Sequence, residues 1–370
     1  MRIAYDHQIF WWQEYGGISR YYVELANALA SMGGNEVKVV APLYVNRYLR
    51  HASPELRVTG IAVPPWRGST AIYRALAAFP MRMLLDRFRP DIVHETYYSA
   101  ERRAPPESRV VLTVFDMIHE KFPERFQADD PTSRDKAAAV SRADHVICIS
   151  EHTRRDLIEM LGVPEEKTSV VYLASSIAEE HISASVQFDR PYLLYVGSRS
   201  GYKNFSSLLK AYAGSALLRD HFLLVCFGGG VFSIKELESQ HDLGLSPRHV
   251  RYVSGGDDIL AGLYSGADAF VCPSIYEGFG IPPLEAMSMG CPVACSGSSS
   301  LPEVVGDAAE TFDPTNIEEI GEVIGNIVAS EEKQARMAQI GRNRASFFTW
   351  KKCAEQTLSV YQACAAAGVQ

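Results

Sequence analysis

The chain has 370 residues, a length that suits two domains of similar size better than a single core. Its 47% hydrophobic and 22% charged content is that of a globular protein, which excludes a largely disordered chain. The net charge of -8 argues against a dedicated nucleic-acid binder, because such proteins usually carry a basic excess.

The first residues, MRIAYDHQIF, begin a strand pattern and lack the features of a secretory signal. No apolar stretch approaches the ~20 residues needed to cross a bilayer, so we expect a cytosolic protein. The seven cysteines form no paired CxxC motif, which disfavours a zinc site and a disulfide framework. Cys148, Cys226 and Cys272 lie in strand-like runs and are expected in the core.

Strand-like and helical segments alternate through the first half of the chain. The strand pattern RIAYD is followed by a helical pattern, ISRYYVELANALASMG, and by a second strand pattern, EVKVVAP. Further strands are expected at residues 91–95, 109–116, 145–150 and 168–174. This order predicts a parallel sheet covered by helices.

A polar segment at residues 175–190 is the expected linker to a second alternating series. That series begins with the strand pattern PYLLYVGS and a helix from about Phe205, and it continues with HFLLVCFG, HVRYVS, AFVCPS and PVACS. We therefore expect an α/β fold with two doubly wound domains, at residues 1–175 and 190–346. Parallel sheets bind ligands at the carboxyl ends of their strands, which predicts a cleft between the domains.

Residues 273–293, PSIYEGFGIPPLEAMSMGCPV, carry the strongest motif. A strand ends there and a helix opens at Ile281, which predicts a phosphate site formed by the N–H groups of Phe279, Gly280 and Ile281. Glu277 in the loop and Glu285 in the expected first turn of the helix could accept hydrogen bonds from sugar and ribose hydroxyls. Either glutamate alone could be an ordinary residue near a helix start, but the whole pattern favours a site.

A second loop of the same kind is YVGSRSGYKN, residues 195–204. Gly197 follows a strand, and Arg199 and Lys203 are placed to neutralise a departing diphosphate. Either cation alone could equally be a solvated surface residue. In the first half, Gly16 and Gly17 precede a helix and would let the backbone approach a ligand. They do not form GxGxxG, which disfavours an NAD enzyme.

Together, these motifs resemble the retaining family 4 glycosyltransferases with the GT-B fold. The resemblance covers nearly the whole chain and rests on GGISRY, ADHVICISEHTRRDL, YVGSRSGYKN, ADAFVCPSIYEGFGIPPLEAM, SSSLPEVVGDAA and the last helix. It implies two Rossmann-like domains facing across a cleft, with a C-terminal helix at about 347–370 that crosses back to the N-terminal domain. It also implies retention of the anomeric configuration, by front-face attack of the acceptor hydroxyl with the donor phosphate taking the proton.

The resemblance also assigns roles to single residues. It implies that Arg199 and Lys203 bind the diphosphate of a nucleotide-sugar donor, and that Glu277 and the backbone from Gly278 to Ile281 hold the transferred sugar. Glu285 would hold the ribose. No metal ion or other cofactor is expected, because cationic side chains and a helix end replace a divalent ion.

One departure concerns the T-x-H motif that many relatives carry at the end of a strand. This chain reads TVFD from Thr113 to Asp116, and His119 follows one short turn later. Asp116 and His119 are therefore candidate catalytic residues, although His119 could equally hold its loop in place. His94 and Tyr97, in DIVHETYY, are candidate acceptor contacts.

The segments DMIHEKFP and SSSLPEVVGDAA look most like mannosyltransferases that build bacterial surface polysaccharides such as O-antigen or capsule. The first choice of donor is GDP-mannose, ahead of GDP-rhamnose or a UDP-sugar, with a glycan or lipid-linked acceptor. Residues 45–110 hold eleven arginines and six acids, an excess of 11 minus 6, or +5. Together with Trp66, Tyr73, Phe79 and Met83 they could rest on the inner face of a membrane, or form a solvated surface.

Two other functions remain open at this point. A nucleotide-sugar epimerase of the same fold would interconvert sugars without an acceptor. A non-catalytic scaffold would bind a partner through the basic N-terminal surface, but the complete set of candidate cations and acids argues against it.

Overall fold

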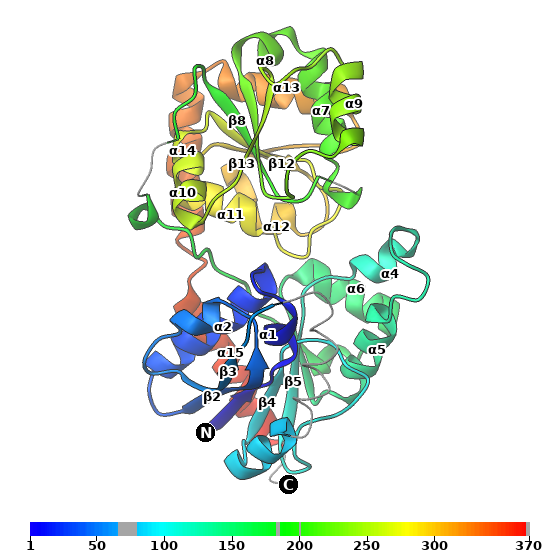
Figure 1. Cartoon of the computed structure of the whole chain (residues 1–370), viewed down its shortest axis with the longest axis vertical. Coiled ribbons are helices and arrows are strands. Elements are labelled where there is room, and N and C mark those ends of the chain that lie inside the picture. Colours follow the sequence, from blue (N-terminus) through cyan, green and yellow to red (C-terminus); the bar gives the residue numbers. More distant parts are fainter. Residues whose placement is uncertain (66–79, 183–185, 200, 368–370) are drawn as a thin grey trace. The chain divides into compact units, whose positions relative to one another are not determined.

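The computed structural model describes residues 1–65, 80–182, 186–199 and 201–367. These residues form two compact units, each built on its own sheet (Figure 1). The first unit combines Met1–Leu173 with the segment from Thr349 onward, and the second unit is Ala174–Phe348. The first unit is therefore assembled from two separate pieces of the sequence.

The first unit contains a seven-stranded parallel sheet in the order β3-β2-β1-β4-β5-β6-β7. Its strands are β1 (Arg2–Tyr5), β2 (Glu36–Tyr44), β3 (Arg57–Ala62), β4 (Ile92–Glu95), β5 (Arg109–Val114), β6 (His145–Cys148) and β7 (Thr168–Val170). The helices with described bounds are α1 (Gln8–Trp12), α2 (Gly17–Ser31), α4 (Ile118–Lys121), α5 (Thr132–Arg142), α6 (Glu151–Leu161) and α15 (Trp350–Ala366).

The last helix, α15, packs against α2 and β5 of the first unit. Cys353, Thr357 and Tyr361 recur every four residues and are buried, so they form one stripe on the helix. On the α2 side, Tyr21, Tyr22 and Leu25 are buried as well. The C-terminal helix thus belongs to the N-terminal unit, as the family resemblance implies.

The second unit contains a six-stranded parallel sheet in the order β10-β9-β8-β11-β12-β13. Its strands are β8 (Tyr192–Val196), β9 (Leu223–Phe227), β10 (Val250–Val253), β11 (Ala269–Cys272), β12 (Val293–Ser296) and β13 (Ala309–Phe312). The helices are α7 (Phe205–Gly214), α8 (Ala216–His221), α9 (Ile234–Asp242), α10 (Asp257–Gly266), α11 (Ile281–Ser288), α12 (Leu301–Val305), α13 (Ile317–Val328) and α14 (Glu331–Ala345).

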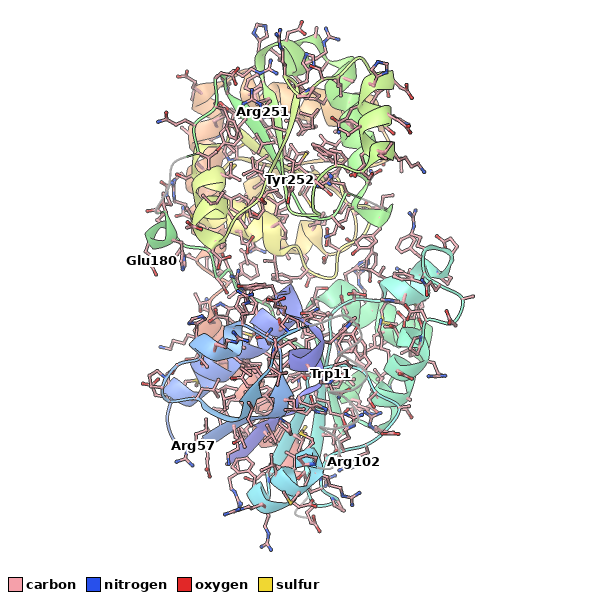
Figure 2. The ribbon with its side chains drawn as sticks, in the orientation of Figure 1. Trp11, Arg57, Arg102, Glu180, Arg251 and Tyr252 are labelled. Atoms are coloured by element: carbon pink, nitrogen blue, oxygen red, sulfur yellow. The ribbon has the colours of Figure 1, made fainter. Side chains whose placement is uncertain are left out.

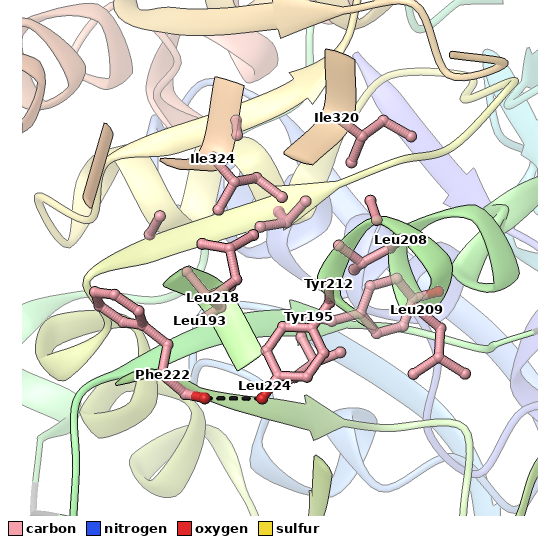
Figure 3. Packing of buried hydrophobic residues seen from close by; sticks show 14 of the residues in the cluster. Leu193, Tyr195, Leu208, Leu209, Tyr212, Leu218, Phe222, Leu224, Ile320 and Ile324 are labelled. Atoms are coloured by element: carbon pink, nitrogen blue, oxygen red, sulfur yellow. Dashed lines mark hydrogen bonds between the residues drawn. The ribbon is translucent and has the colours of Figure 1, made fainter. Parts of the chain in front are cut away.

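Helices α7 and α13 cover this sheet with a continuous apolar core (Figure 3). Leu208 of α7 and Ile320 and Ile324 of α13 are fully buried, in the same cluster as Leu193 of β8. The buried Tyr212 hydroxyl donates to the Phe222 carbonyl at 2.8 Å, which satisfies the polar group inside the core.

Each sheet has one point at which the strand order reverses. In the first unit the neighbours at this point are β1 and β4, and in the second unit they are β8 and β11. Loops that leave neighbouring strands in opposite directions open a crevice at the carboxyl edge of the sheet, and ligands bind in such crevices. Ligand sites are therefore expected in the loops after these four strands.

The two predicted doubly wound sheets are confirmed, and Cys148, Cys226 and Cys272 are buried as expected. The sequence does not predict β3 and β13. Both lie at a sheet edge, and their residues are partly exposed, so neither gives a continuous apolar run.

Candidate active site

Lys203 and Glu277 meet at the point where the strand order of the second sheet reverses, which we call its switch point. Lys203 ends a short 3₁₀ turn (Gly201–Lys203) after β8, and Glu277 lies in the loop after β11. The Lys203 ammonium donates to both Glu277 carboxylate oxygens, at 2.8 and 3.0 Å. Because β8 and β11 are neighbours, two motifs that are distant in the sequence form one cluster.

This ion pair is largely withdrawn from solvent, since the two side chains are 19% and 11% exposed. Burial acts to lower the pKa of the Lys203 ammonium, but the Glu277 carboxylate outweighs it and holds that pKa above its usual value. Lys203 is therefore positively charged at neutral pH.

The helix α11 starts four residues after Glu277. Gly280 caps the helix with a φ of 115°, and a Cβ there would lie 2.8 Å from the Leu301 side chain, so the position requires glycine. The helix begins at Ile281, as predicted. Pro282 and Pro283 carry no N–H, which leaves the amides of Gly280 and Ile281 at the positive end of the helix.

Two serines that the sequence analysis did not single out hold the Glu277 loop. Ser299 accepts a hydrogen bond from the Glu277 N–H at 2.9 Å, and Ser300 donates to the carbonyls of Glu277 and Phe279 at 2.8 and 2.9 Å. Both belong to SSSLPEVVGDAA, one of the segments that carry the family resemblance, and they directly precede α12.

Glu285 is the fifth residue of α11, so it lies in the second helical turn. The prediction that it lies in the first turn is wrong. Its side chain is buried, and its Oε2 accepts a hydrogen bond from the Tyr264 hydroxyl at 3.0 Å. The expected contact with a ribose stays a prediction.

Arg199 has a setting different from the predicted one. Its side chain is only 2% exposed and forms an ion pair with Glu236 at 2.7 Å. The guanidinium also donates to the carbonyls of Gly228 and Gly230, each at 2.7 Å. It packs over the ring of Tyr252, labelled in Figure 2. Through these contacts Arg199 fastens the glycine loop after β9. Its contact with a diphosphate stays a prediction.

His94 is also placed differently from the prediction. It is fully buried in the first unit, with Nδ1 2.5 Å from the Tyr361 hydroxyl and Nε2 2.9 Å from the Thr113 hydroxyl. Tyr5 extends this network, with its hydroxyl 3.0 Å from that of Tyr361. A side chain with no exposed surface and both ring nitrogens engaged does not contact an acceptor, so His94 is a core residue.

The buried His94 makes the first unit sensitive to acid. Burial lowers the pKa of His94 to about 3, whereas an unfolded histidine titrates near 6.5. Between these values the unfolded chain binds the extra proton, so stability is present above about pH 6.5 and falls as pH falls. At pH 5 the expected loss is roughly 2 kcal/mol, from about 1.5 pH units at about 1.4 kcal/mol each.

Urea unfolding at pH 7.5 and pH 5, followed by circular dichroism, measures this loss. His94→Gln should reduce the difference between the two pH values, whereas His241→Gln, at an exposed site in the second unit, should leave it unchanged. Equal pH dependence in both variants would contradict the assignment.

Asp116 and His119, two further candidates of the first unit, follow strand β5. Asp116 accepts a hydrogen bond from the Ile118 N–H at 3.0 Å, in a turn that leads into α4. His119 stacks on Phe126 with ring centroids 3.8 Å apart, the contact expected of a residue that holds its loop. Burial, followed by the Lys136 charge, lowers the pKa of His119, so the neutral imidazole is favoured. The catalytic roles of Asp116 and His119 stay predictions.

Tyr97 and the paired glycines are the remaining candidates. Tyr97 follows β4 and packs on Trp12, with ring centroids 4.8 Å apart. Gly16 precedes α2, and Gly17 is its first residue. An added Cβ on Gly17 would meet no atom within 4 Å, so backbone packing does not require glycine there.

Among the described residues, no cluster of three His, Cys, Asp or Glu side chains is arranged to hold a metal ion. Within the same residues, no helix has the length and apolar character needed to cross a membrane. Of the predicted membrane surface, Trp66, Tyr73 and Phe79 lie outside the described residues. Several of its arginines pair with acids, among them Arg47 with Glu14.

Comparisons with known proteins agree with this architecture. Residues 15–174 match the model of Glycosyltransferase Family 4, and residues 176–344 match that of Glycosyl transferases group 1. O-antigen chain mannosyltransferase B of Escherichia coli is 30% identical over 269 residues, which cover 69% of this chain and 70% of that protein.

Two solved structures share the fold over nearly the whole chain. Sucrose-phosphate synthase from Thermosynechococcus elongatus aligns with a TM-score of 0.77 at 20% identity, covering 99% of this chain and 100% of that one. HepE of Anabaena, in complex with UDP and glucose, aligns with a TM-score of 0.74 at 17% identity, covering 98% and 99%. From the two family models, the E. coli relative and the two parallel sheets, we conclude that the chain belongs to the family 4 glycosyltransferases of GT-B fold.

Proposed function

We propose that this glycosyltransferase moves a hexose from a nucleotide diphosphate donor to a glycan or lipid-linked acceptor, in the synthesis of a bacterial surface polysaccharide. One observation carries the proposal: Lys203 and Glu277 meet at the switch point of the second sheet, just before the start of α11. A cation next to a positive helix end suits a diphosphate, and a carboxylate suits sugar hydroxyls.

In this scheme Lys203 stabilises the departing nucleotide diphosphate. An ammonium can donate three hydrogen bonds, and among the described residues Glu277 takes two of them, so one N–H can serve a phosphate oxygen. The amides of Gly280 and Ile281 add partial positive charge. This charge substitutes for a divalent ion, so the reaction needs no metal.

For the retention that the family resemblance implies, the placement of the carboxylates favours a front-face route over a covalent one. A covalent route needs a free carboxylate beneath the sugar. Glu277 is paired with Lys203, and Glu285 is buried against Tyr264. In the proposed front-face route the acceptor oxygen bonds to the anomeric carbon, the carbon–phosphate oxygen bond breaks, and the acceptor proton passes to the departing phosphate.

GDP-mannose is the first choice of donor. It is supported by the E. coli relative, which is a mannosyltransferase, and by the sequence segments that look like enzymes of that kind. The HepE complex with UDP and glucose keeps a UDP-sugar as the competing choice. An epimerase would convert the donor without an acceptor, so incubating the donor alone and analysing the sugar separates the two activities.

A thermal-shift comparison of GDP and UDP tests the donor. At one hundred times its dissociation constant a ligand adds about 2.7 kcal/mol to apparent stability. For domains of this size that corresponds to roughly 5–10 °C in Tm. We expect GDP to give such a shift, with EDTA present or absent, and UDP to give little. A shift with UDP alone would overturn the choice of GDP-mannose, and a shift that requires a divalent ion would overturn metal independence.

A further inference from the structure

Residues other than glycine with a positive φ mark strained backbone, and such strain gathers at functional sites. Among the described residues three have this geometry: Arg89, Asn204 and Ser299. Asn204 and Ser299, with φ of 55° and 56°, belong to the second unit, and both adjoin the Lys203–Glu277 pair. Asn204 directly follows Lys203, and Ser299 accepts a hydrogen bond from Glu277. The strained backbone described in the second unit thus lies at the candidate site.

The side chain of Asn204 explains the strain on the lysine side of the site. Its amide donates to the carbonyls of Pro273 and Pro314, at 3.1 and 2.7 Å, and the residue is only 8% exposed. Pro273 begins the loop between β11 and α11. These contacts fix the segment of Lys203 against that loop without help from Ser299.

The hydroxyl of Ser299 explains the strain on the glutamate side. A serine is strained at this φ, whereas glycine adopts it freely, so the hydroxyl is the feature that serine adds there. Its oxygen accepts from the Glu277 N–H at 2.9 Å. Glu277 is therefore held at three points: the N–H by Ser299, the carbonyl by Ser300 at 2.8 Å, and the carboxylate by Lys203.

The start of α11, to which we assign the diphosphate, is held by other contacts. The Phe279 carbonyl accepts from Ser300 at 2.9 Å. The Leu301 side chain packs on Gly280 so closely that no Cβ fits there. The hydrogen bond of Ser299 goes instead to Glu277, the residue whose carboxylate we assign to the sugar. The two halves of a nucleotide-sugar donor thus depend on different supports.

We propose that Ser299 is a positioning residue that sets the affinity for the transferred sugar separately from the affinity for the nucleotide diphosphate, an inference that rests on the glycosyltransferase function proposed above. Without the Ser299 hydroxyl the Glu277 peptide can shift, while the segment of Lys203 and the start of α11 keep their own contacts. The carboxylate then meets the sugar hydroxyls in poorer geometry, which weakens those hydrogen bonds.

Ser299→Gly isolates the hydroxyl, because glycine adopts the same backbone without strain. The relief of strain offsets the lost hydrogen bond, so Tm should stay within about 2 °C of the unsubstituted value. Isothermal titration calorimetry with GDP-mannose and with GDP measures the two affinities. We expect the Kd of GDP-mannose to rise about 3- to 10-fold and that of GDP to change less than about 2-fold.

Two neighbouring serines supply the comparisons. Ser298, whose backbone N–H donates to the Ser296 hydroxyl at 3.1 Å, is the matched control, and Ser298→Ala should leave both Kd values unchanged. Ser300→Ala removes the donor to the Glu277 and Phe279 carbonyls. It should lower Tm and weaken GDP-mannose and GDP alike, because it loosens both the glutamate and the start of α11.

The outcomes separate this inference from the proposed function. If the unsubstituted protein binds both ligands, an unchanged GDP-mannose affinity in Ser299→Gly would contradict the positioning role alone, and so would an equal loss for GDP-mannose and GDP. If it binds UDP-glucose and UDP instead, the choice of GDP-mannose is wrong, and the same comparison with that pair decides the role of Ser299. Binding of none of the four ligands would contradict the proposed function, and this inference with it.

Discussion

Replacing Lys203 by glutamine should lower kcat for sugar transfer by about 10²- to 10³-fold, the cost typical of removing one group that stabilises charge in a transition state. Glutamine retains hydrogen-bonding capacity but not the charge that the departing diphosphate requires. Lys210→Gln is the matched control, because Lys210 is exposed on α7 of the same unit. Steady-state kinetics with the donor identified by thermal shift measures the effect.

The partner variant distinguishes catalysis from stability. Glu277→Gln leaves the largely buried Lys203 without its counter-ion, which costs up to about 3–5 kcal/mol of folding stability. Combining Lys203→Gln with Glu277→Gln removes both charges and should recover much of that stability. Activity should not recover with it. Transfer at the normal rate by the stable double variant would refute the assigned roles.

Arg199→Lys should destabilise the second unit by about 2–4 kcal/mol, less than a fully buried pair would lose, since the Glu236 side chain is 27% exposed. Lysine keeps the charge but cannot reach Glu236 and the carbonyls of Gly228 and Gly230 at the same time. Urea unfolding measures the loss, and Arg248→Lys, at an exposed position of the same unit, is the control.

The same variant tests the two roles of Arg199 against each other. A residue that fastens the glycine loop should lose stability and donor affinity together, because Gly229 packs against Gly197 and Arg199 in the loops after β9 and β8. A loss of GDP affinity with an unchanged free energy of unfolding would instead support the direct diphosphate contact that the sequence suggests.

The sequence predicts the fold well because its central strands are apolar on both faces. It places Lys203 and Glu277 in the loops of one domain for a related reason: both residues follow apolar runs, β8 and β11. That these two strands are neighbours, so that the two side chains pair, comes from the structure. The edge strands β3 and β13 escape such reasoning because exposed residues interrupt their apolar pattern. The other two edge strands, β7 and β10, have no exposed residue and are predicted.

The settings of Arg199 and His94 could not be predicted because they depend on residues far away in the chain. The partner of Arg199 is Glu236, on α9, and Tyr361, which meets His94, comes from the last helix. Sequence spacing shows that a charged or polar residue ends a strand. It does not show whether a later segment will cover that residue. Ser299 and Ser300 escape notice for the same reason, since their hydrogen bonds reach back more than twenty residues.

The return of α15 to the first unit has a consequence for synthesis on the ribosome. At ~5–20 residues per second, the ribosome needs about 10–35 s to make the intervening 174–348 segment. During that interval the surface that later receives Cys353, Ala354 and Tyr361 stays uncovered, with Tyr5 and His94 beside it. The second unit can therefore complete its core before the first unit does, so the order of folding reverses the order of translation.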